Sequence, residues 1–313
     1  MRSALTSPLS VEEILAALGD SVLSHCGPAH VTVDAVAALG DAAAAGALSF
    51  CSTRGVGGED EIAASRAAVI LCRIEALERL RGADPGKALI AVDNPRLAFV
   101  QAIPLRVPPP AGATGIAQSA TISSSAVIGE DVAIGEMAVI GEDCVVGAGT
   151  RIAAGAVLYD RVRLGARCTV QAGAVIGAEG FGFERDGAGP LHRFPHVGGV
   201  TIADEVEVGA RACIDRDALG DTQIGAGTKI DDAAYIAHNV RIGRHCLIMA
   251  QALLCGSCVI GAGAGISPGA VIRDKVRISD GARIGLGAVV VGDVEAGATV
   301  AGVPARPIER RRE

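Results

Sequence analysis

An aliphatic residue returns at every sixth position over most of this chain, from Ile122 to Val290. The residue after it is very often Gly, and the residue two before it is small. This period fits neither an α-helix nor a strand with alternating faces. It is typical of a hexapeptide solenoid, in which three short strands form each triangular coil and the aliphatic side chain points inward. The sequence therefore predicts a mainly β protein built around a left-handed parallel β-helix.

The composition agrees with a narrow aliphatic core and excludes several classes of protein. Half of the residues are hydrophobic, but only 2% are aromatic, because a thin prism has no room for large rings. The formal net charge of −7 argues against a nucleic-acid binder. We expect no membrane span, since no uncharged apolar run reaches about 18 residues. Glu12 and Glu13 stand where a signal peptide would need its apolar stretch, so we expect a cytoplasmic protein.

The nine cysteines are scattered, and we interpret them as reduced, packed thiols. Four of them, Cys144, Cys168, Cys246 and Cys258, fall at solenoid positions where a small apolar residue is expected. Cys255 and Cys258 have C-x-x-C spacing, but no second pair completes a zinc site.

The chain divides into regions by its periodicity. Residues 1–106 lack the hexads and are predicted to form a small α/β domain. Ser10 and Glu13 form a candidate capping box for a helix ending near Leu18. We predict further helices at 75–81 and 95–101, and buried strands at 47–50, 67–71 and 88–92. A Pro-rich linker at 107–112 leads into the β-helix at 113–305, and a charged tail covers 306–313.

Two interruptions break the solenoid. Residues 179–199 form a Gly-rich excursion that holds three of the five Phe residues. A four-residue phase slip lies between Ile214 and Ile224, at residues 217–221. Long segments that leave a regular scaffold are usually functional, so both mark a candidate site.

A hexapeptide prism is compatible with acyl transfer, with a metal-dependent carbonic anhydrase, or with a structural assembly subunit. The anhydrase needs about three His around zinc, but the only solenoid histidines, His238 and His245, lie seven residues apart. Acyl transfer needs a base and an N–H donor for the oxyanion. One coil of 18 residues beyond His238 is Gly256, which would place an open backbone N–H beside an imidazole. A lone His is also compatible with a purely structural role.

Several longer motifs resemble one family. The segments Gly180-Phe181-Gly182-Phe183 and Arg193-Phe194-Pro195-His196-Val197-Gly198 precede an Asp-Arg-x-Ala-Leu motif at 215–219 and an Ala-His-Asn-Val motif at 237–240. Residues 94–99 match the end of the same family's N-terminal domain. In these features the chain resembles the UDP-3-O-acylglucosamine N-acyltransferases of lipid A biosynthesis.

The resemblance implies a homotrimer with active sites in clefts between prisms, and a nucleotide-binding N-terminal domain, residues 1–106, that helps to hold the uridine. It implies that His238 is the general base for the 2-amine of a UDP-amino sugar, and that the Gly256 N–H helps to hold the oxyanion. The donor would be the thioester of a 3-hydroxyacyl carrier protein, and no cofactor is expected. We expect Phe181, Arg193 and His196 in the excursion to close over the sugar and diphosphate. Asp231 and Asn239, in the remaining motifs, are assigned to substrate binding.

Three departures from the family bear on the substrate. Lys275 stands where the family has a second active-site His, and it could lower the pKa of His238, hold a phosphate, or be a solvated surface charge. In the uracil pocket Phe50 is kept, as a stacking or simply a buried residue. Thr53 and Val56 replace an Asn and a Tyr. We expect no counterpart of the family's C-terminal helical extension. A divergent N-acyltransferase acting on another amino sugar, with a carrier-protein or acyl-CoA donor, and a prism without activity therefore stay open.

Overall fold

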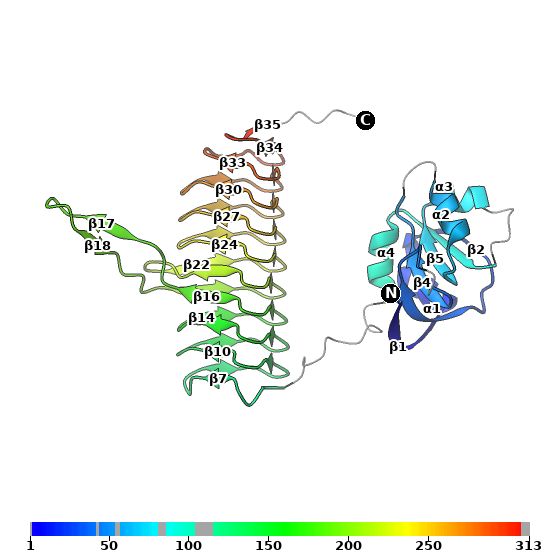
Figure 1. The fold of residues 1–313 in the computed structure, drawn as a ribbon, viewed down its shortest axis with the longest axis horizontal. Helices are drawn as coiled ribbons and strands as arrows, with labels where there is room; N and C mark the ends of the chain where they lie inside the picture. The colour runs from blue at the N-terminus through cyan, green and yellow to red at the C-terminus, as the bar shows by residue number, and fades with distance from the viewer. Residues whose placement is uncertain (1, 42–43, 54–56, 81–85, 104–114, 308–313) are drawn as a thin grey trace. The chain divides into compact units, whose positions relative to one another are not determined.

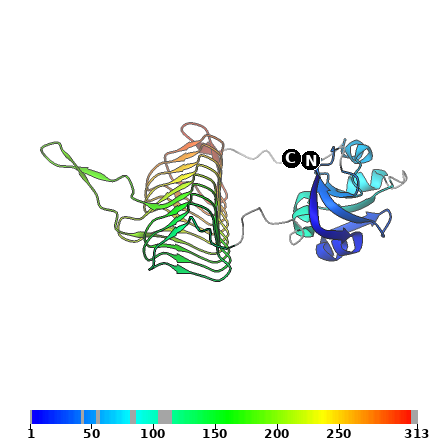
Figure 2. The same cartoon turned by 60° about the horizontal axis from the view of Figure 1, so that its bottom comes forward.

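The structure is a computed structural model that describes residues 2–41, 44–53, 57–80, 86–103 and 115–307. The chain forms two compact units, Met1–Pro110 and Ala111–Glu313, which Figures 1 and 2 show in two views. The predicted linker at 107–112 lies outside the described residues, as does Val56. No described helix is long and apolar enough to cross a membrane.

The first unit is a six-stranded sheet with helices on both faces (Figure 1). The strand order is β1-β3-β4-β5-β6-β2, with parallel pairing from β3 to β6 and antiparallel edges. Helices α1 and α4 share one apolar core with the sheet, and α2 and α3 share the other. The strands are β1 (Arg2–Ser10), β2 (Val22–Cys26), β3 (Thr32–Ala37), β4 (Ala47–Phe50), β5 (Val69–Cys72) and β6 (Ala88–Val92). The helices are α1 (Val11–Leu18), a 3₁₀ turn at Gly19–Ser21, α2 (Gly58–Ala64), α3 (Ile74–Leu80) and α4 (Pro95–Ala102).

The apolar runs located the buried strands of this unit well, because parallel strands covered on both faces are continuously hydrophobic. The capping box at α1 is present, with Ser10 and Glu13 each accepting the other's backbone N–H. Strands β1 to β3 and helix α2 were not predicted. The edge strand β1 contains Pro8 and polar residues and carries no apolar run, so its pairing with β3 is a tertiary effect.

The second unit is the hexapeptide prism, whose three faces are parallel sheets (Figure 1). Each face adds one two- to four-residue strand per coil, paired with the strand 18 residues away except across the two interruptions and in the last coil. The first face holds β7 (Thr121–Ile122), β10 (Val139–Ile140), β13 (Val157–Leu158), β16 (Val175–Ala178), β21 (Cys213–Asp215), β24 (Tyr235–Ile236), β27 (Leu253–Leu254), β30 (Val271–Ile272) and β33 (Val289–Val290).

The other two faces continue each coil in the same order. The second face holds β8 (Val127–Ile128), β11 (Val145–Val146), β14 (Val162–Leu164), β19 (Gly199–Ile202), β22 (Asp221–Ile224), β25 (Arg241–Ile242), β28 (Val259–Ile260) and β31 (Arg277–Ile278). The third face holds β9 (Ala133–Ile134), β12 (Arg151–Ile152), β15 (Thr169–Val170), β20 (Glu207–Val208), β23 (Lys229–Ile230), β26 (Leu247–Ile248), β29 (Gly265–Ile266), β32 (Arg283–Ile284), β34 (Thr299–Ala301) and β35 (Arg306–Pro307). Strand β35 pairs antiparallel with β34, so regular structure includes the first two residues of the predicted tail.

The interior of the prism is one continuous aliphatic cluster made by the sixth-position residues. The small residue two positions earlier turns inward as well, which is why Ala, Val, Thr and Cys alternate there. The four solenoid cysteines are all buried there, as expected, and all nine cysteines are free thiols.

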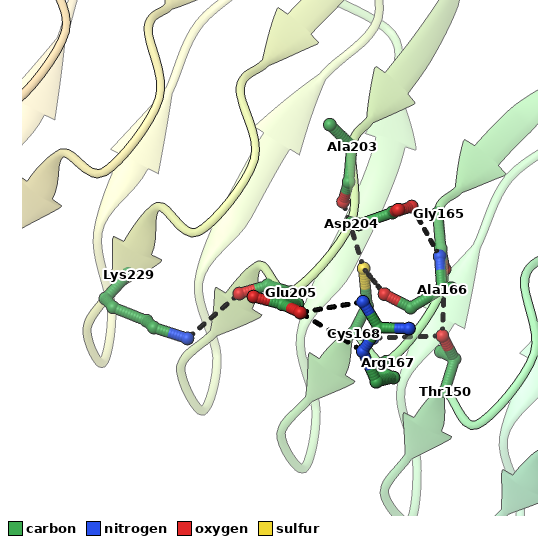
Figure 3. A network of polar contacts seen from close by, with 9 residues as sticks. All are labelled: Thr150, Gly165, Ala166, Arg167, Cys168, Ala203, Asp204, Glu205 and Lys229. Atoms are coloured by element: carbon green, nitrogen blue, oxygen red, sulfur yellow. Dashed lines mark hydrogen bonds and ion pairs between the residues drawn. The ribbon is translucent and has the colours of Figure 1, made fainter.

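Polar contacts join successive coils at the corner between the second and third faces (Figure 3). The buried Thr150 hydroxyl donates to the Gly165 carbonyl at 2.9 Å and accepts from the Cys168 N–H at 3.0 Å. The Asp204 carboxylate accepts the N–H of Ala166 at 2.8 Å. At this corner the buried Thr150 and the exposed Asp204 therefore both bond to the backbone of a neighbouring coil, which satisfies groups that the tight turn would leave unpaired.

Both interruptions of the hexad period lie at the corner between the first and second faces, which we call the first corner. The excursion leaves after β16 and returns at β19, and the phase slip leaves after β21 and returns at β22, in the next coil. The excursion carries the antiparallel hairpin β17 (Phe183–Arg185) and β18 (Leu191–Arg193). This hairpin projects away from the prism (Figures 1 and 2).

Candidate active site

His238 lies at the first corner, in the coil that follows the two interruptions. It sits between β24 and β25, and the N–H of the next residue, Asn239, bonds to the Thr222 hydroxyl at 3.1 Å in the coil below. The backbone of Asn239 has a φ of 62°, in the left-handed region that Asn tolerates better than most residues. The turn therefore presents a half-buried imidazole at the edge of the prism.

The imidazole of His238 is enclosed by glycines and by a second histidine. Its ring makes an edge-to-face contact with His196, with 4.9 Å between ring centroids. A Cβ on Gly180 would lie 2.7 Å from the His196 ring and 2.8 Å from the His238 Cβ. A Cβ on Gly256 would lie 2.8 Å from the His238 ring. Only glycine at both positions leaves room for this pair of rings.

Gly256 lies one coil above His238, as the 18-residue spacing predicted. The N–H of Ser257 donates to the His238 carbonyl at 3.0 Å, which fixes the register of the two corners. No described residue accepts a hydrogen bond from the Gly256 N–H. A proton acceptor and a free backbone donor thus lie next to each other at one corner.

Two further side chains connect His238 to the phase slip. The Nδ1 atom of His238 is 2.6 Å from the Asn239 Oδ1. The Asn239 Nδ2 donates to Asp217 Oδ1, also at 2.6 Å. Asp217 is only 7% exposed, and the same oxygen accepts the N–H groups of Leu219 at 3.0 Å and Gly220 at 3.1 Å.

A buried carboxyl group lies close to both histidines. Asp215 is 3% exposed and accepts a hydrogen bond from the Tyr235 hydroxyl at 2.6 Å. Burial raises the pKa of the Asp215 carboxyl, while the Tyr235 hydrogen bond and the charges of His238 and His196 act in the opposite direction. The site therefore has a buried acidic group under its imidazole pair.

Arg216, the residue after Asp215, links coils by bonding to backbone carbonyl groups. It is 7% exposed, and its Nε donates to the Gly177 carbonyl at 2.6 Å. Its Nη2 donates to the Asp160 carbonyl at 3.4 Å. The guanidinium thus ties the phase slip to the corners of the two coils below it. The Asp-Arg-x-Ala-Leu motif gives no role for Asp215, Arg216 or Asp217 from the sequence alone. Only the stacking of coils brings Asp215 and Asp217 to the His238 corner and Arg216 to the coils below.

The predicted residues of the excursion are placed differently from one another. His196 is 4% exposed, and its Nδ1 is 3.0 Å from the Phe194 carbonyl oxygen. Phe181 is 81% exposed and contacts Phe183. Arg193 pairs with Glu179 at 3.3 Å and lies over the Phe183 ring at 4.8 Å.

Lys275 and Asp231 lie at different corners of the prism. Lys275 stacks on the first corner above Gly256, whose carbonyl accepts its N–H at 3.0 Å, and its side chain is exposed. Asp231 follows β23, between the third and first faces, where its carboxylate accepts the N–H groups of Asp232 and Ala250. Within one chain, Asp231 therefore does not join the His238 corner.

The two predicted uracil residues lie in the first unit. Phe50 packs on Phe99, with ring centroids 5.0 Å apart, and is half-buried. The Thr53 hydroxyl donates to the Glu61 carboxylate at 3.1 to 3.2 Å. Asn94 caps α4 by accepting the Leu97 N–H. The described residues contain no cluster of His, Cys, Asp or Glu that could hold a metal ion.

The hexapeptide repeats of the second unit are similar to a known family over part of their length. The family model for bacterial transferase hexapeptide repeats (six repeats) matches residues 125–160, 143–178 and 221–256. The last match includes both His238 and Gly256. The predicted fold class, a left-handed parallel β-helix with a small α/β unit, is confirmed.

The particular relatives agree with the resemblance seen in the sequence. The chain is 52% identical over 101 residues to UDP-3-O-acylglucosamine N-acyltransferase 1 of Gloeobacter violaceus, and 54% identical over 100 residues to UDP-3-O-acylglucosamine N-acyltransferase of Coxiella burnetii. Each match covers 32% of this chain and 29% of the relative, so less than a third of either length is aligned.

Solved structures support the fold alone. A UDP-N-acetylglucosamine O-acyltransferase from Moraxella catarrhalis RH4 superposes with a TM-score of 0.56 at 22% identity, covering 62% of this chain and 73% of the other. A UDP-N-acetylglucosamine acyltransferase from Bacteroides fragilis 9343 gives 0.57 at 24% identity, covering 62% and 74%.

Proposed function

We propose that the protein is an N-acyltransferase that moves a 3-hydroxyacyl chain from a carrier-protein thioester to the 2-amine of a UDP-3-O-acylglucosamine. The observation that carries this proposal is that the His238 imidazole packs against Gly256, whose backbone N–H has no acceptor among the described residues. The similarity to UDP-3-O-acylglucosamine N-acyltransferases supports the substrate class. Acyl transfer from a thioester needs a base and an N–H donor for the oxyanion, and this corner offers both.

The reaction follows from these two groups. The sugar amine attacks the thioester carbonyl, and His238 takes the proton that the nitrogen loses as the C–N bond forms. The carbonyl oxygen becomes an oxyanion, which the Gly256 N–H stabilises. The C–S bond then breaks, and the imidazolium returns its proton to the leaving thiolate. The products are an amide and a free thiol.

One assay separates the candidate activities. The protein is incubated with UDP-amino sugars and either a 3-hydroxyacyl carrier protein or the matching acyl-CoA, and products are identified by intact mass. We expect acylation from the carrier protein, and His238→Ala should lower turnover by about a hundredfold or more. Product formed only from acyl-CoA would favour the divergent acyltransferase, and no product from any pair would favour a prism without activity.

We further propose a homotrimer that packs through the first face. Its outward residues form an almost wholly apolar column that is exposed or half-exposed from end to end. The column is Thr121, Val139, Val157, Val175, Cys213, Tyr235, Leu253, Val271 and Val289. The outward column of the third face instead carries Arg151, Glu207, Lys229 and Arg283. Covering an apolar strip of this length would stabilise an oligomer.

Sedimentation of two variants, each with one outward-facing leucine replaced, tests this interface. Leu253 faces outward from the first face, and Leu247 faces outward from the third face in the preceding strand. Leu253→Glu should dissociate the oligomer, because the charge would be buried against a partner. Leu247→Glu should leave the trimer intact. A trimer that survives Leu253→Glu, or a monomeric parent, would contradict the proposed interface.

Nucleotide recognition by the first unit is the part of the proposal that rests on the resemblance. Phe50 would present the ring face not used by Phe99 to the uracil, and Thr53 would have to exchange its Glu61 contact for a base contact. We expect Phe50→Ala to raise the KM for the UDP-sugar. An unchanged KM would remove Phe50 from the binding site.

Lys275 and Arg193 are the cations proposed to meet anionic parts of the substrates. Lys275 is exposed on the same corner as His238, whereas Arg193 would have to leave Glu179. A pH–rate profile of Lys275→Ala tests the first. A shifted acid limb is expected if the ammonium acts on His238, and an unchanged profile would leave Lys275 as a surface charge.

A further inference from the structure

We infer that Asp217 is a positioning residue that acts through Asn239 to hold His238 in the tautomer with hydrogen on Nδ1, so that Nε2 is the atom that accepts the proton. The inference deepens the proposed function and rests on it only for the identity of the reaction. It is carried by a chain of hydrogen bonds whose directions are fixed by chemistry.

The first step is the carboxylate. Asp217 Oδ1 receives the N–H groups of Leu219, Gly220 and the Asn239 side chain, so it acts as an acceptor in all three contacts. The first two anchor it to its own turn, and its 7% exposure keeps water from competing. The carboxylate is therefore a fixed acceptor aimed at Asn239.

The second step is the amide of Asn239, whose two ends have similar shapes and opposite hydrogen-bonding roles. Only the Nδ2 end can donate to Asp217, at 2.6 Å. The Oδ1 end must then face His238, and it also accepts the Ala218 N–H at 3.4 Å. A flipped amide would turn its oxygen toward a carboxylate and its NH₂ toward a backbone N–H. Two contacts therefore select one orientation.

The third step is the imidazole. Asn239 Oδ1 can only accept, so the His238 Nδ1 at 2.6 Å must carry the hydrogen. The lone pair of the neutral ring is left on Nε2. This atom lies 2.9 Å from the position that a Gly256 Cβ would occupy, so it faces the corner that bears the free N–H. The proton acceptor thus lies beside the residue that bears the free N–H.

Other titratable groups around His238 act differently. Asp215, under the ring pair, is held by Tyr235 and acts on both histidines through its charge. His196 presents its ring edge, and its own Nδ1 must donate to the Phe194 carbonyl. Neither group contacts Nδ1 of His238. Asn239 therefore selects the His238 tautomer, and Asp217 orients Asn239.

Two readouts on the intact protein test the inference. The first is the ¹⁵N spectrum of histidine-labelled protein at alkaline pH, with His238→Ala used to assign the signals. Protonated and unprotonated ring nitrogens have well-separated shifts. We expect Nδ1 protonated and Nε2 unprotonated in the parent. The opposite tautomer in the parent would overturn the inference without any variant and whether or not the protein is active.

The second readout is Asp217→Ala, with Asp217→Asn as the conservative variant. Alanine removes the acceptor of the Asn239 Nδ2, so the Asn239 amide no longer has one selected orientation, whereas the oxygen of an asparagine can still accept all three N–H groups. For Asp217→Ala we expect a mixture of His238 tautomers, a KM within about twofold of the parent, and a kcat about 10-fold lower. This loss is smaller than the roughly 100- to 10,000-fold that proton-transfer catalysis contributes, because part of the population keeps the productive tautomer. Asp217→Asn should restore the single tautomer and most of the kcat. Asp204→Ala is the control, because Asp204 also accepts a backbone N–H, but at another corner.

The outcomes are distinct. An active parent whose Asp217→Ala variant keeps a single tautomer and the parent kcat would refute the role of Asp217. A loss of kcat equal to that of Asp204→Ala would show a merely structural effect and also refute it. Failure to detect acyl transfer in the parent would instead count against the proposed function, while the tautomer measurement would still decide the hydrogen-bond assignment.

Discussion

A single methyl group placed at Gly256 should disable the site without unfolding the prism. Gly256 lacks a positive φ, so Ala is allowed by the backbone. Its Cβ, however, would lie 2.8 Å from the His238 Cε1 and 2.9 Å from Nε2. Carbon atoms in contact sit about 3.5 to 4.0 Å apart, so the ring would have to move by roughly 0.7 to 1 Å.

The ring has little freedom to make this movement. Asn239 holds Nδ1 on one side, and His196 meets the ring on another. Displacing a reacting group by about 1 Å can cost about a hundredfold in rate. We therefore expect Gly256→Ala to lower kcat/KM by about a hundredfold, with an overpacking cost of about 1 to 3 kcal/mol in stability.

The chain offers a matched control for this experiment. Gly292 occupies the same corner two coils further on, and no atom lies within 4 Å of the position of its added Cβ. Steady-state kinetics and thermal unfolding are measured for Gly256→Ala and Gly292→Ala together. We expect only the first to lose activity. Equal and near-parental activity in both variants would refute the claim that His238 is packed against Gly256.

Three further predictions concern stability and thiol chemistry. Because burial raises the pKa of the Asp215 carboxyl, the folded state binds that proton more tightly, and the contribution of Asp215 to stability should fall as the pH rises above about 4. In urea unfolding, the stability of Asp215→Asn relative to the parent should therefore increase as the pH rises above about 4, and a difference that does not change with pH would contradict this. Arg216→Met should cost about 1.5 to 3 kcal/mol by removing a charged donor from the Gly177 carbonyl, and Arg216→Lys should not restore the loss, which denaturant titration measures. Maleimide should leave the buried solenoid thiols unmodified in the native protein at pH 8 and modify them after denaturation, as measured by mass spectrometry. The reason is that burial raises the pKa values of these thiols, that of Cys258 to about 12. Labelling of the native protein would contradict their packing. These thiols are Cys144, Cys168, Cys246 and Cys258.

The α/β unit illustrates where patterns in the sequence were sufficient. The runs at 47–50 and 88–92 became β4 and β6 with the same bounds, and Ser10 capped α1. Strands buried on both faces and helices with capped ends carry local signals. The edge strands β1 and β2 have weaker local signals, because each forms only by pairing with a strand from elsewhere in the chain, β1 with β3 and β2 with β6.

The sequence by itself determined the coil. A six-residue period with small residues at fixed offsets predicts a triangular prism, and the 18-residue repeat by itself places Gly256 over His238. Those are local or strictly periodic properties. The tertiary structure alone decided which irregular residues meet. Both interruptions leave the prism at one corner, in consecutive coils, because each adds residues between a first-face strand and the second-face strand that follows it. That stacking brought Asp217, His196 and Asp215 to His238 across about 20 to 42 residues of chain, at positions no period marks.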